Sequence, residues 1–275
     1  MAAFGRLLDI MDSLREDCPW NAAQTFESIR PLTEEEVYEL SDAILKGDTA
    51  ALCKEIGDLL YHLVFYARIA QESGLFDIAD SLDRICEKMI FRHPHVFGAQ
   101  KGEAVTAKEI ADTWELVKAR EKGGNRTVMS GIPDAMPALL KAMSLQEKAR
   151  GCGFDWSKRE DVWDKVREEI AEVREACREE GPDAIPGAET QAAASPNPVP
   201  TAHQTEEFGD LLFAVINAAR LYGVDAEAAL NGTCSKFRRR FDYVEAGLRE
   251  QGRSFSEVTL TDMDALWDEA KKKGL

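Results

Sequence analysis

Two acidic patterns in the sequence carry the residue types that could do chemistry. Each consists of a Glu-x-x-Glu pair followed, after a connection, by a Glu-x-x-Asp pair. The members are Glu36, Glu39, Glu55 and Asp58 in the first pattern, and Glu169, Glu172, Glu207 and Asp210 in the second. Side chains three residues apart lie on one helix face about one turn apart. Two such pairs on adjacent helices would therefore give four converging carboxylates.

The Glu-x-x-Asp pairs begin two very apolar stretches, EIGDLLYHLVFYA and EFGDLLFAVINAA. A helix that is apolar on nearly all sides is expected to be buried, where an ionised carboxylate must be paired, protonated or bound to a metal. The bases Arg68 and Arg220 follow Asp58 and Asp210 by almost three turns, so we expect no local ion pair. A divalent cation is then the simplest counter-charge, and oxygen-only ligands favour Mg²⁺, with Mn²⁺ as the alternative.

Simpler interpretations compete with a metal site. A Glu-x-x-Glu pair alone is usually a solvent-exposed helix face, and an Asp in an apolar helix is more often paired with Lys or Arg. Neither acidic pattern contains the Glu-x-x-His pair that helical di-iron sites use. His93 and His95 are separated by a proline, which favours a turn or a helix end over metal ligation.

Basic and aromatic residues recur after each acidic pattern. Lys-x-x-x-Arg and Trp-x-x-x-Lys pairs follow in the same order in both halves: Lys88, Arg92, Trp114 and Lys118, then Lys236, Arg240, Trp267 and Lys271. Beside a magnesium site these cations favour a polyphosphate, and the Trp267 ring either stacks on a base or packs in the core. The sequence has no GxxxxGK[ST] or GxGxxG loop. The ordered repetition predicts a tandem duplication.

Apolar residues recur at helical spacing along almost the whole chain, and alternating β-branched runs are nearly absent. We therefore predict an all-α fold. The expected helices span residues 3–16, 33–46, 48–73, 77–91, 106–121, 134–150, 158–180, 204–222, 225–250 and 261–273. The expected N-caps are Thr33, Asp48, Asp77, Asp225 and Thr261.

Two segments interrupt the helical pattern. The stretch KGGNRTVMSGIP combines Gly, Ser and Pro and is predicted to be a domain linker. The Pro-rich residues 181–203 lack apolar periodicity and are predicted to form a mobile loop. The expected domains are residues 1–122 and 134–275, joined by a linker at 123–133.

Composition excludes several classes of function. The chain has 275 residues with 34 Lys and Arg against 50 Asp and Glu, a formal net charge of −16. This charge opposes binding to nucleic acids and anionic membranes, and no apolar run is long enough to span a membrane. Six cysteines without a CxxC or Cys/His pairing, and an N-terminus without a secretory signal, predict reduced thiols in a cytoplasmic protein.

As a set, these motifs resemble the MazG family of all-α nucleoside triphosphate pyrophosphohydrolases, in its two-domain form. The segments that occur in the family's order are CPWNAAQTF, EEVYEL, EIGDLLYHLVFYA, RHPHVFG, GFDW, KVREEIAEV, EFGDLLFAVINAARL, KFRRRF and LWDEAKK. The resemblance implies Mg²⁺-dependent hydrolysis of an NTP or dNTP to the monophosphate and pyrophosphate, in nucleotide-pool house-cleaning or regulation. It also implies a homodimer whose helices combine into four-helix bundles.

The resemblance implies roles for individual residues. In the second half the metal ligands would be Glu169, Glu172, Glu207 and Asp210, with Glu169 or Glu172 as the catalytic base. The substrate would contact Lys165, Glu168, Glu206, Lys236, Arg240, Trp267 and Lys271. In the first half the metal ligands would be Glu36, Glu39, Glu55 and Asp58, and the substrate residues Lys88, Arg92, Trp114 and Lys118.

One difference separates the two halves. Lys165 lies four residues before Glu169, whereas Leu32 lies four residues before Glu36. The first half thus lacks one phosphate-facing cation, and we expect the second half to be the main catalytic site and the first a weaker copy. Two alternatives remain: a helical interaction or dimerisation module without catalysis, and a same-fold pyrophosphatase acting on phosphoribosyl-ATP or dUTP.

Overall fold

The computed structural model describes residues 2–98, 127–178 and 200–275, and, between the first two ranges, residues 101, 106, 109–110, 114 and 117–118. The chain divides into two compact units, one formed by residues 1–110 and 120–122 and the other by residues 111–119 and 123–275. In the part of the chain that is described, every regular element is a helix. The all-α prediction is therefore confirmed.

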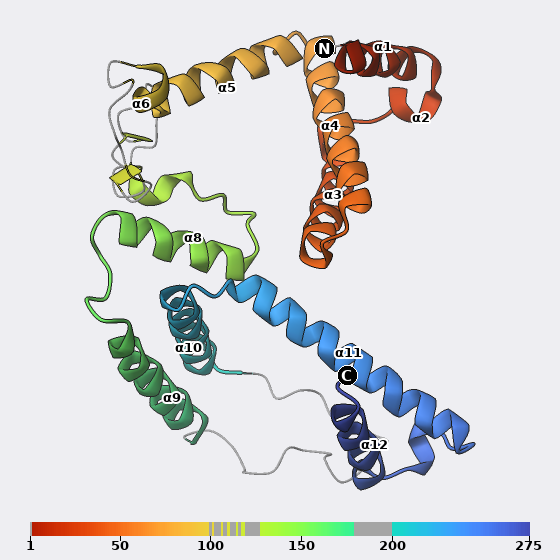
Figure 1. The fold of residues 1–275 in the computed structure, drawn as a ribbon, viewed down its shortest axis with the longest axis vertical. Helices are drawn as coiled ribbons and strands as arrows, with labels where there is room; N and C mark the ends of the chain where they lie inside the picture. Colours follow the sequence, from red (N-terminus) through yellow and green to blue (C-terminus); the bar gives the residue numbers. More distant parts are fainter. Residues whose placement is uncertain are drawn as a thin grey trace. The chain divides into compact units, whose positions relative to one another are not determined.

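The first unit is built around a helical hairpin. Helices α3 and α4 lie side by side, and α1 packs against α4 (Figure 1). The helices of this unit are α1 (Ala2–Asp17), α2 (Pro19–Ala22), α3 (Phe26–Lys46), α4 (Thr49–Glu72), α5 (Ile78–Arg92) and α6 (Pro94–Phe97). Its core consists of Met11, Ile29, Val64, Phe65 and Ile69. This core thus packs α1 against one end of the hairpin.

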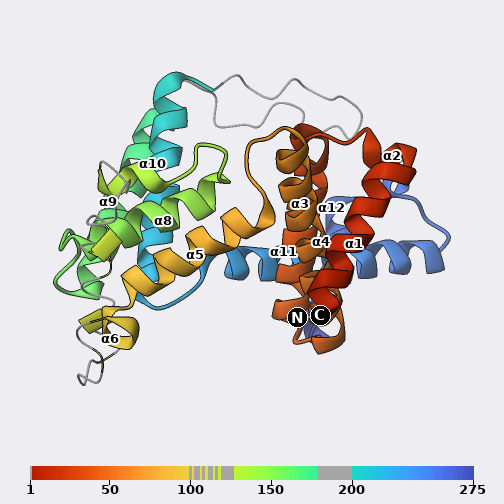
Figure 2. The same cartoon turned by 90° about the horizontal axis from the view of Figure 1, so that it is seen from above.

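The second unit contains a second hairpin. Helices α9 and α10 lie side by side with α8 against α10, and α11 packs against α12 (Figures 1 and 2). The helices are α8 (Ala138–Gly151), α9 (Val162–Arg178), α10 (Ala202–Leu221), α11 (Ala226–Glu250) and α12 (Leu260–Lys272), with 3-10 turns at Val128–Gly131, Arg159–Asp161 and Phe255–Glu257. Val162, Val166, Ala214 and Ala218 fill the space between α9 and α10.

Three of the predicted N-caps are confirmed, and two are wrong. Asp48, Asp77 and Asp225 accept backbone hydrogen bonds at the starts of α4, α5 and α11. Helix α12, however, is capped by Thr259 rather than Thr261, because the Thr259 and Asp262 side chains form a capping box two residues earlier.

Helix α3 begins at Phe26 rather than at residue 33, with Thr25 as its N-cap. The prediction placed the N-cap at Thr33 because Thr33 and Glu36 match the spacing of a capping box. The reciprocal bonds between Thr25 and Ser28 secure the first turn, and the helix continues through Pro31. Thr33 is consequently inside the helix, where its hydroxyl donates to the carbonyl of Ile29 at 3.2 Å.

The two interrupting segments are only partly described. Residues 179–199 of the predicted loop region lie outside the described residues, but α10 begins at Ala202, so the last residues of the predicted 181–203 loop are helical. Most of the predicted helix at 106–121 and the first residues of the predicted linker also lie outside them. All six cysteines are free. Among the described helices, none is long and apolar enough to cross a membrane.

An ion pair fastens α10 to the segment that precedes α9. Arg220 donates to Asp155 through two nitrogens, at 3.1 and 2.5 Å, and both side chains are mostly buried. These hydrogen bonds from Arg220 hold the pKa of Asp155 below its ordinary value. A lowered folded-state pKa stabilises the fold above the unfolded-state pKa of about 3.9, and this contribution is lost as pH falls through the folded-state pKa.

We expect Asp155→Asn to lower the free energy of unfolding by about 1–2 kcal/mol at pH 6, because it breaks a charge-assisted pair. The difference from the parent should shrink as the pH falls below the ordinary Asp pKa of about 3.9 and through the lowered folded-state pKa of Asp155. Urea unfolding at pH 6 and at a series of lower pH values measures this difference. Glu147→Gln is the control, since Glu147 is 3.8 Å from Arg220 and exposed. A pH-independent effect of Asp155→Asn would contradict the assignment.

Candidate active site

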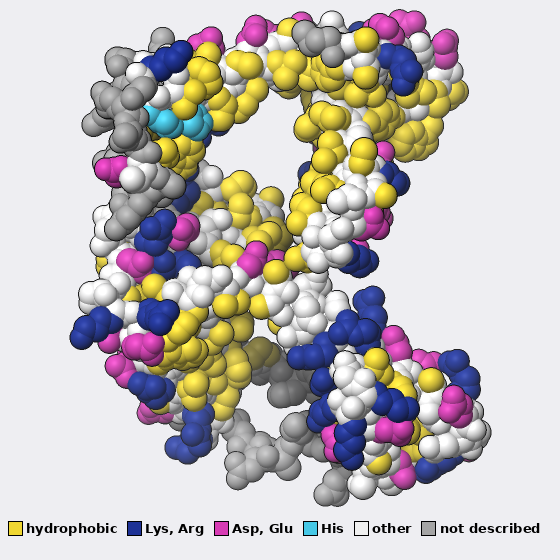
Figure 3. Space-filling view, viewed as in Figure 1, with side chains coloured by type: hydrophobic (Ala, Val, Ile, Leu, Met, Phe, Trp, Pro, Cys, Tyr) yellow, Lys and Arg dark blue, Asp and Glu magenta, His cyan; other side chains and the backbone are white. Residues whose placement is uncertain are grey.

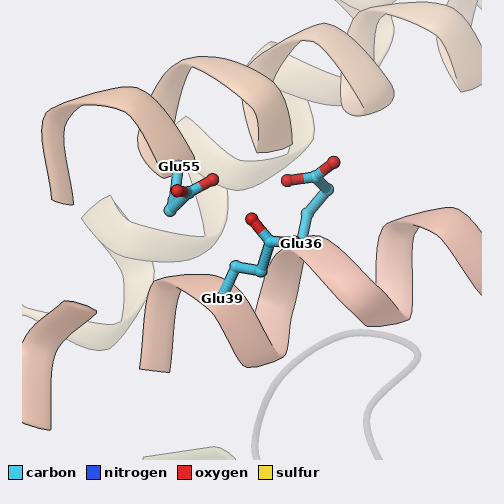
Figure 4. A group of neighbouring side chains, drawn as sticks. All are labelled: Glu36, Glu39 and Glu55. Carbon is cyan, nitrogen blue, oxygen red and sulfur yellow. The ribbon is translucent and has the colours of Figure 1, made fainter. Parts of the chain in front are cut away.

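The α3–α4 hairpin brings together three carboxylates of the first acidic pattern. Glu36 and Glu39 come from α3 and Glu55 from α4, and one carboxylate oxygen of each lies within 4.8 Å of the others. Figure 4 shows the three side chains reaching into the space between the two helices. The tight connection depends on Gly47, which ends α3 at a φ of 66°, a conformation that favours glycine. We call these three residues and Asp58 the first cluster.

Burial makes negative charge costly in the first cluster. Glu55 is only 5% exposed, and the Oε2 atom of Glu36 is buried and has no hydrogen-bond partner. Desolvation, together with the charges of Asp58 and Glu39, raises the pKa of Glu36. An acceptor that lacks a donor and lies beside other carboxylates is suited to bind a cation.

A lysine that the sequence reasoning missed also lies in this cluster. The Nζ atom of Lys54 is 3.0 Å from Glu55, 3.2 Å from Asp58 and 3.7 Å from Glu39. The prediction that no local base pairs with these acids is therefore wrong for the first half. The signal was present, because Lys54 precedes Asp58 by four residues, which is one helical turn. Arg68, as predicted, does not reach the cluster but pairs with Asp12 and Glu72.

An open cavity of about 630 Å³ adjoins the first cluster. It is lined by Glu35, Tyr38, Glu39, Asp42, Ala43, Lys46, Asp48, Ala51 and Glu55. Small-molecule sites have volumes of about 300–1,000 Å³, so the hairpin leaves room for a ligand beside two of its carboxylates.

The α9–α10 hairpin forms the corresponding second cluster. Glu169 of α9 and Glu207 and Asp210 of α10 each place one carboxylate oxygen within 4.8 Å of the others. Glu169 is only 4% exposed, which matches the burial of Glu55. Lys165 donates to Glu169 at 2.6 Å and to Glu168 at 3.0 Å. A local base therefore neutralises the buried acid in this half as well.

Glu172 lies beside Glu169 and Glu207, whose charges act on it. A hydrogen bond between Glu172 and Glu169, followed by desolvation and the charges of Glu169 and Glu207, raises the pKa of Glu172. His203, which sequence reasoning missed, has its Nδ1 atom 3.3 Å from Glu207. We include Glu172 in the second cluster. Glu206 is exposed on α10.

The expectation that the Glu-x-x-Asp helices are buried on nearly all sides is wrong. Asp210 is exposed, Asp58 is partly exposed, and large apolar side chains are exposed beside them. These side chains occupy matching positions: Val37, Ile56, Leu60 and Leu63 in the first half, and Ile170, Phe208, Leu212 and Val215 in the second. Figure 3 shows hydrophobic side chains on the surfaces of both hairpins. The hairpins thus lack a covering layer on one face.

Four of the predicted substrate residues of the second half lie on α11 and α12, namely Lys236, Arg240, Trp267 and Lys271. The guanidinium of Arg240 lies 5.7 Å from the centre of the Trp267 ring, and Trp267 also packs against the Val244, Leu248 and Val258 core. Lys271 pairs with Asp268 at 2.9 Å. Within the described residues, no hydrogen bond, ion pair or ring contact joins Lys236, Arg240, Trp267 or Lys271 to the second cluster.

In the first half, the predicted substrate residues form two pairs at four-residue spacing. Lys88 and Arg92 are one turn apart on α5, and the Nζ atom of Lys118 is 5.9 Å from the centre of the Trp114 ring. The structure therefore brings three acids of each half together. That the cation and aromatic pairs bind the substrate beside these acids stays a prediction.

The donor atoms of both clusters fit a hard divalent cation. Each offers three carboxylate oxygens from two packed helices and no sulfur, and Mg²⁺ and Mn²⁺ prefer such oxygen ligands. The unpartnered oxygen of Glu36 and the raised pKa of Glu172 both report negative charge that lacks a full counter-charge.

Comparison with known proteins places this geometry in a family. The MazG nucleotide pyrophosphohydrolase domain matches residues 24–97 and 158–244, so each match contains one acidic hairpin. A nucleoside triphosphate pyrophosphohydrolase from Escherichia coli K12 is 40% identical over 278 residues, covering 99% of this chain and 98% of that protein. The nucleoside triphosphate pyrophosphohydrolase/pyrophosphatase MazG of Thermotoga maritima is 37% identical, covering 98% of this chain and 95% of that protein.

A crystal structure of a mazG-related protein from Thermotoga maritima is also similar, with 29% identity, 42% of this chain and 99% of that chain covered, and a TM-score of 0.38. The double match of the domain confirms the tandem duplication that the repeated motifs predict. This chain belongs to the MazG nucleotide pyrophosphohydrolase family.

Proposed function

We propose that this protein hydrolyses nucleoside triphosphates to nucleoside monophosphates and pyrophosphate with Mg²⁺, and that the second cluster is the main catalytic site. The observation that carries the proposal is the convergence of Glu169, Glu207 and Asp210 within 4.8 Å on the second MazG domain. Relatives that align over nearly the whole chain are named nucleoside triphosphate pyrophosphohydrolases, which supports an enzyme rather than a binding module.

The chain's own residues divide the work of this reaction. When bound, Mg²⁺ supplies positive charge at the triphosphate and lowers the pKa of a water molecule. Glu169, Glu207 and Asp210 would hold the ion. Glu172, whose raised pKa suits a proton acceptor, would take the proton from the attacking water. The water oxygen bonds to the α-phosphorus as the bond to the bridging oxygen breaks, and pyrophosphate leaves.

Cations of the second unit would balance the charge of the leaving pyrophosphate. Lys165 lies at the buried edge of the second cluster, while Lys236, Arg240 and Lys271 belong to the α11–α12 pair. Charge-assisted hydrogen bonds from such groups to phosphate oxygens stabilise a phosphoryl-transfer transition state. Glu168 and Glu206 directly precede Glu169 and Glu207 in the sequence. They would help to position the substrate by contacting its bound metal ion and its sugar.

Removing one ligand or the base should abolish the reaction. We expect Asp210→Ala and Glu172→Ala each to lower the rate of pyrophosphate release by at least about 100-fold, since each removes a charge that acts at the reacting phosphate. Both variants should remain folded, because both side chains are exposed. The measurement is pyrophosphate release from an NTP and dNTP panel, with circular dichroism as the folding check.

Glu175→Ala is the matched control, because Glu175 is an exposed acid on the same helix as Glu172. It should retain the parent rate. Full activity in both Asp210→Ala and Glu172→Ala would contradict the site. Release of a nucleoside diphosphate and phosphate instead of a monophosphate and pyrophosphate would contradict the reaction.

Ligand binding to the folded state separates the enzyme from a purely structural helical module. We expect Mg²⁺ with a non-hydrolysable nucleotide analogue to raise the melting temperature, because a ligand that binds only the native state stabilises it. Differential scanning fluorimetry measures the shift, and Asp210→Asn should reduce it. No shift in the parent protein would favour the interaction module.

The same panel of substrates distinguishes the remaining alternatives. The names of the full-length relatives support nucleoside triphosphates over phosphoribosyl-ATP or dUTP alone. Hydrolysis of several NTPs and dNTPs would agree with a role in nucleotide-pool house-cleaning or regulation.

The six free cysteines are consistent with the proposed cytoplasmic location. The acidic net charge is consistent with a small-molecule substrate rather than a nucleic acid.

We also propose that the protein is a homodimer in which a second copy covers an apolar hairpin face. Leu60 is 42% and Leu212 63% exposed, and each lies in an exposed apolar row, two residues after the aspartate of its cluster. Contiguous apolar patches of this kind mark interfaces. A second hairpin would complete a four-helix bundle and bury them.

A charge placed in such a row should prevent association. We expect Leu212→Glu to convert the dimer to a monomer, because it would bury an unpaired carboxylate in the interface. Light scattering coupled to size-exclusion chromatography measures the mass. Leu230→Glu is the control, since Leu230 is an exposed leucine on α11 outside the hairpins. An unchanged mass for Leu212→Glu would rule out this face.

A further inference from the structure

The ammonium group of Lys54 occupies the middle of the first cluster. It contacts Glu55 and Asp58 on its own helix, α4, and Glu39 across the hairpin on α3, at 3.0, 3.2 and 3.7 Å. One cation thus bridges carboxylates from both helices that form the cluster. A divalent ion held by the same oxygens would take the same position.

The second half has the opposite charge at the equivalent place. Lys54 directly precedes Glu55, whereas Glu206 directly precedes Glu207, the matching residue of the second pattern. The lysine of the second cluster, Lys165, comes from α9 instead and contacts only Glu168 and Glu169. The α10 acids, Glu207 and Asp210, therefore have no lysine among them in the described structure.

We propose that Lys54 is a built-in counter-cation that competes with divalent metal ions for the first cluster and makes it the weaker of the two metal sites. This inference rests on the proposed metal-binding function of the clusters. Metal binding requires the lone pairs of Glu55 and Asp58, to which the ammonium group now donates hydrogen bonds. A divalent ion beside the ammonium group would also meet a like charge.

Competition, rather than permanent blockage, follows from the position of Lys54. Its side chain is 62% exposed, so the flexible stem can swing into solvent when a metal ion displaces it. The buried acid, Glu55, would then be neutralised by the metal. The cost of releasing three ion pairs lowers metal affinity in the first half, whereas the second half has no such lysine to displace from Glu207 and Asp210.

Binding of Mn²⁺ alone to the full chain tests the inference. In an Asp210→Asn background, which disables the second cluster, Mn²⁺ titration followed by electron paramagnetic resonance reports on the first cluster. We expect Lys54→Met, which keeps the apolar stem, to tighten Mn²⁺ binding by about tenfold or more. Lys54→Gln should act in the same direction, and circular dichroism should show that both variants are folded.

Lys46→Met is the matched control. Lys46 is an exposed lysine that lines the same cavity, but its ion pair is with Asp42 at 2.5 Å, outside the cluster. Loss of its charge acts only at longer range, where salt screens it, so Mn²⁺ affinity should change less than about twofold. A large effect of Lys54→Met on Mn²⁺ affinity, without a similar effect of Lys46→Met, would locate the competition at Lys54.

The reciprocal change should weaken the second cluster. In an Asp58→Asn background, Glu206→Lys places an ammonium group next to Glu207, and we expect about tenfold weaker Mn²⁺ binding.

Equal effects of Lys54→Met and Lys46→Met, or no effect of Lys54→Met and Lys54→Gln, would overturn the inference. If Mn²⁺ still binds the parent and Asp210→Asn removes a site, the proposed function survives that result. If Mn²⁺ binds neither cluster, both fail.

Discussion

Each half of the protein depends on the neutralisation of one buried glutamate between two packed helices. Glu55 and Glu169 are almost fully buried and lie beside further carboxylates. An ionised carboxylate in such a place is stable only with a counter-charge close by. The chain meets this need with a lysine in each hairpin, Lys54 from α4 and Lys165 from α9. These lysines neutralise the acids when no metal ion is bound. Some of their ion pairs would have to break when a metal ion binds.

The two hairpins satisfy the same constraint in different ways, and our proposal assigns them different roles on this basis. In the first, the lysine lies on the helix of the Glu-x-x-Asp pair and contacts both of its acids. In the second, the lysine lies on the opposite helix and leaves Glu207 and Asp210 to other partners. A duplicated domain can therefore retain its carboxylates in both copies and still differ in metal affinity through the position of one cation.

The exposed apolar rows relate the clusters to assembly. In each hairpin, acidic and apolar residues alternate along the same helix, so that Asp58 lies between Ile56 and Leu60, and Asp210 between Phe208 and Leu212. A layer that covers the apolar rows would lie close to the exposed aspartates and lower the dielectric around them. The electrostatic interactions of the clusters would then become stronger. Under the proposed dimer, association and metal binding would therefore be coupled.

Local sequence predicted much of this structure. Helical periodicity and aspartate caps such as Asp48 identified the elements, and the spacing of Glu36, Glu39 and Glu55 predicted their convergence. The start of α3 differs from the prediction because Thr33 and Glu36 match the spacing of a capping box, whereas the box that forms joins Thr25 and Ser28. Pairs distant in sequence, such as Arg220 with Asp155, leave no local pattern.

The exposure of Asp210 was missed for a different reason. An apolar helix has the same sequence whether its covering layer comes from the same chain or from another. Lys54 could have been found, because it lies one turn before Asp58, but only arginines after the aspartates were considered. The sequence therefore predicts which acids converge better than it predicts which cations neutralise them.

The most direct test of the central claim is a metal-specificity switch at Asp210. Cysteine thiolate is a softer ligand than carboxylate and disfavours Mg²⁺ relative to softer ions. We expect Asp210→Cys to lose pyrophosphate release with Mg²⁺ and to recover it with Mn²⁺ or Cd²⁺, relative to the parent protein assayed with the same ions. Full activity of the variant with Mg²⁺, or a folded variant that no ion restores, would contradict the claim that Asp210 holds the catalytic metal.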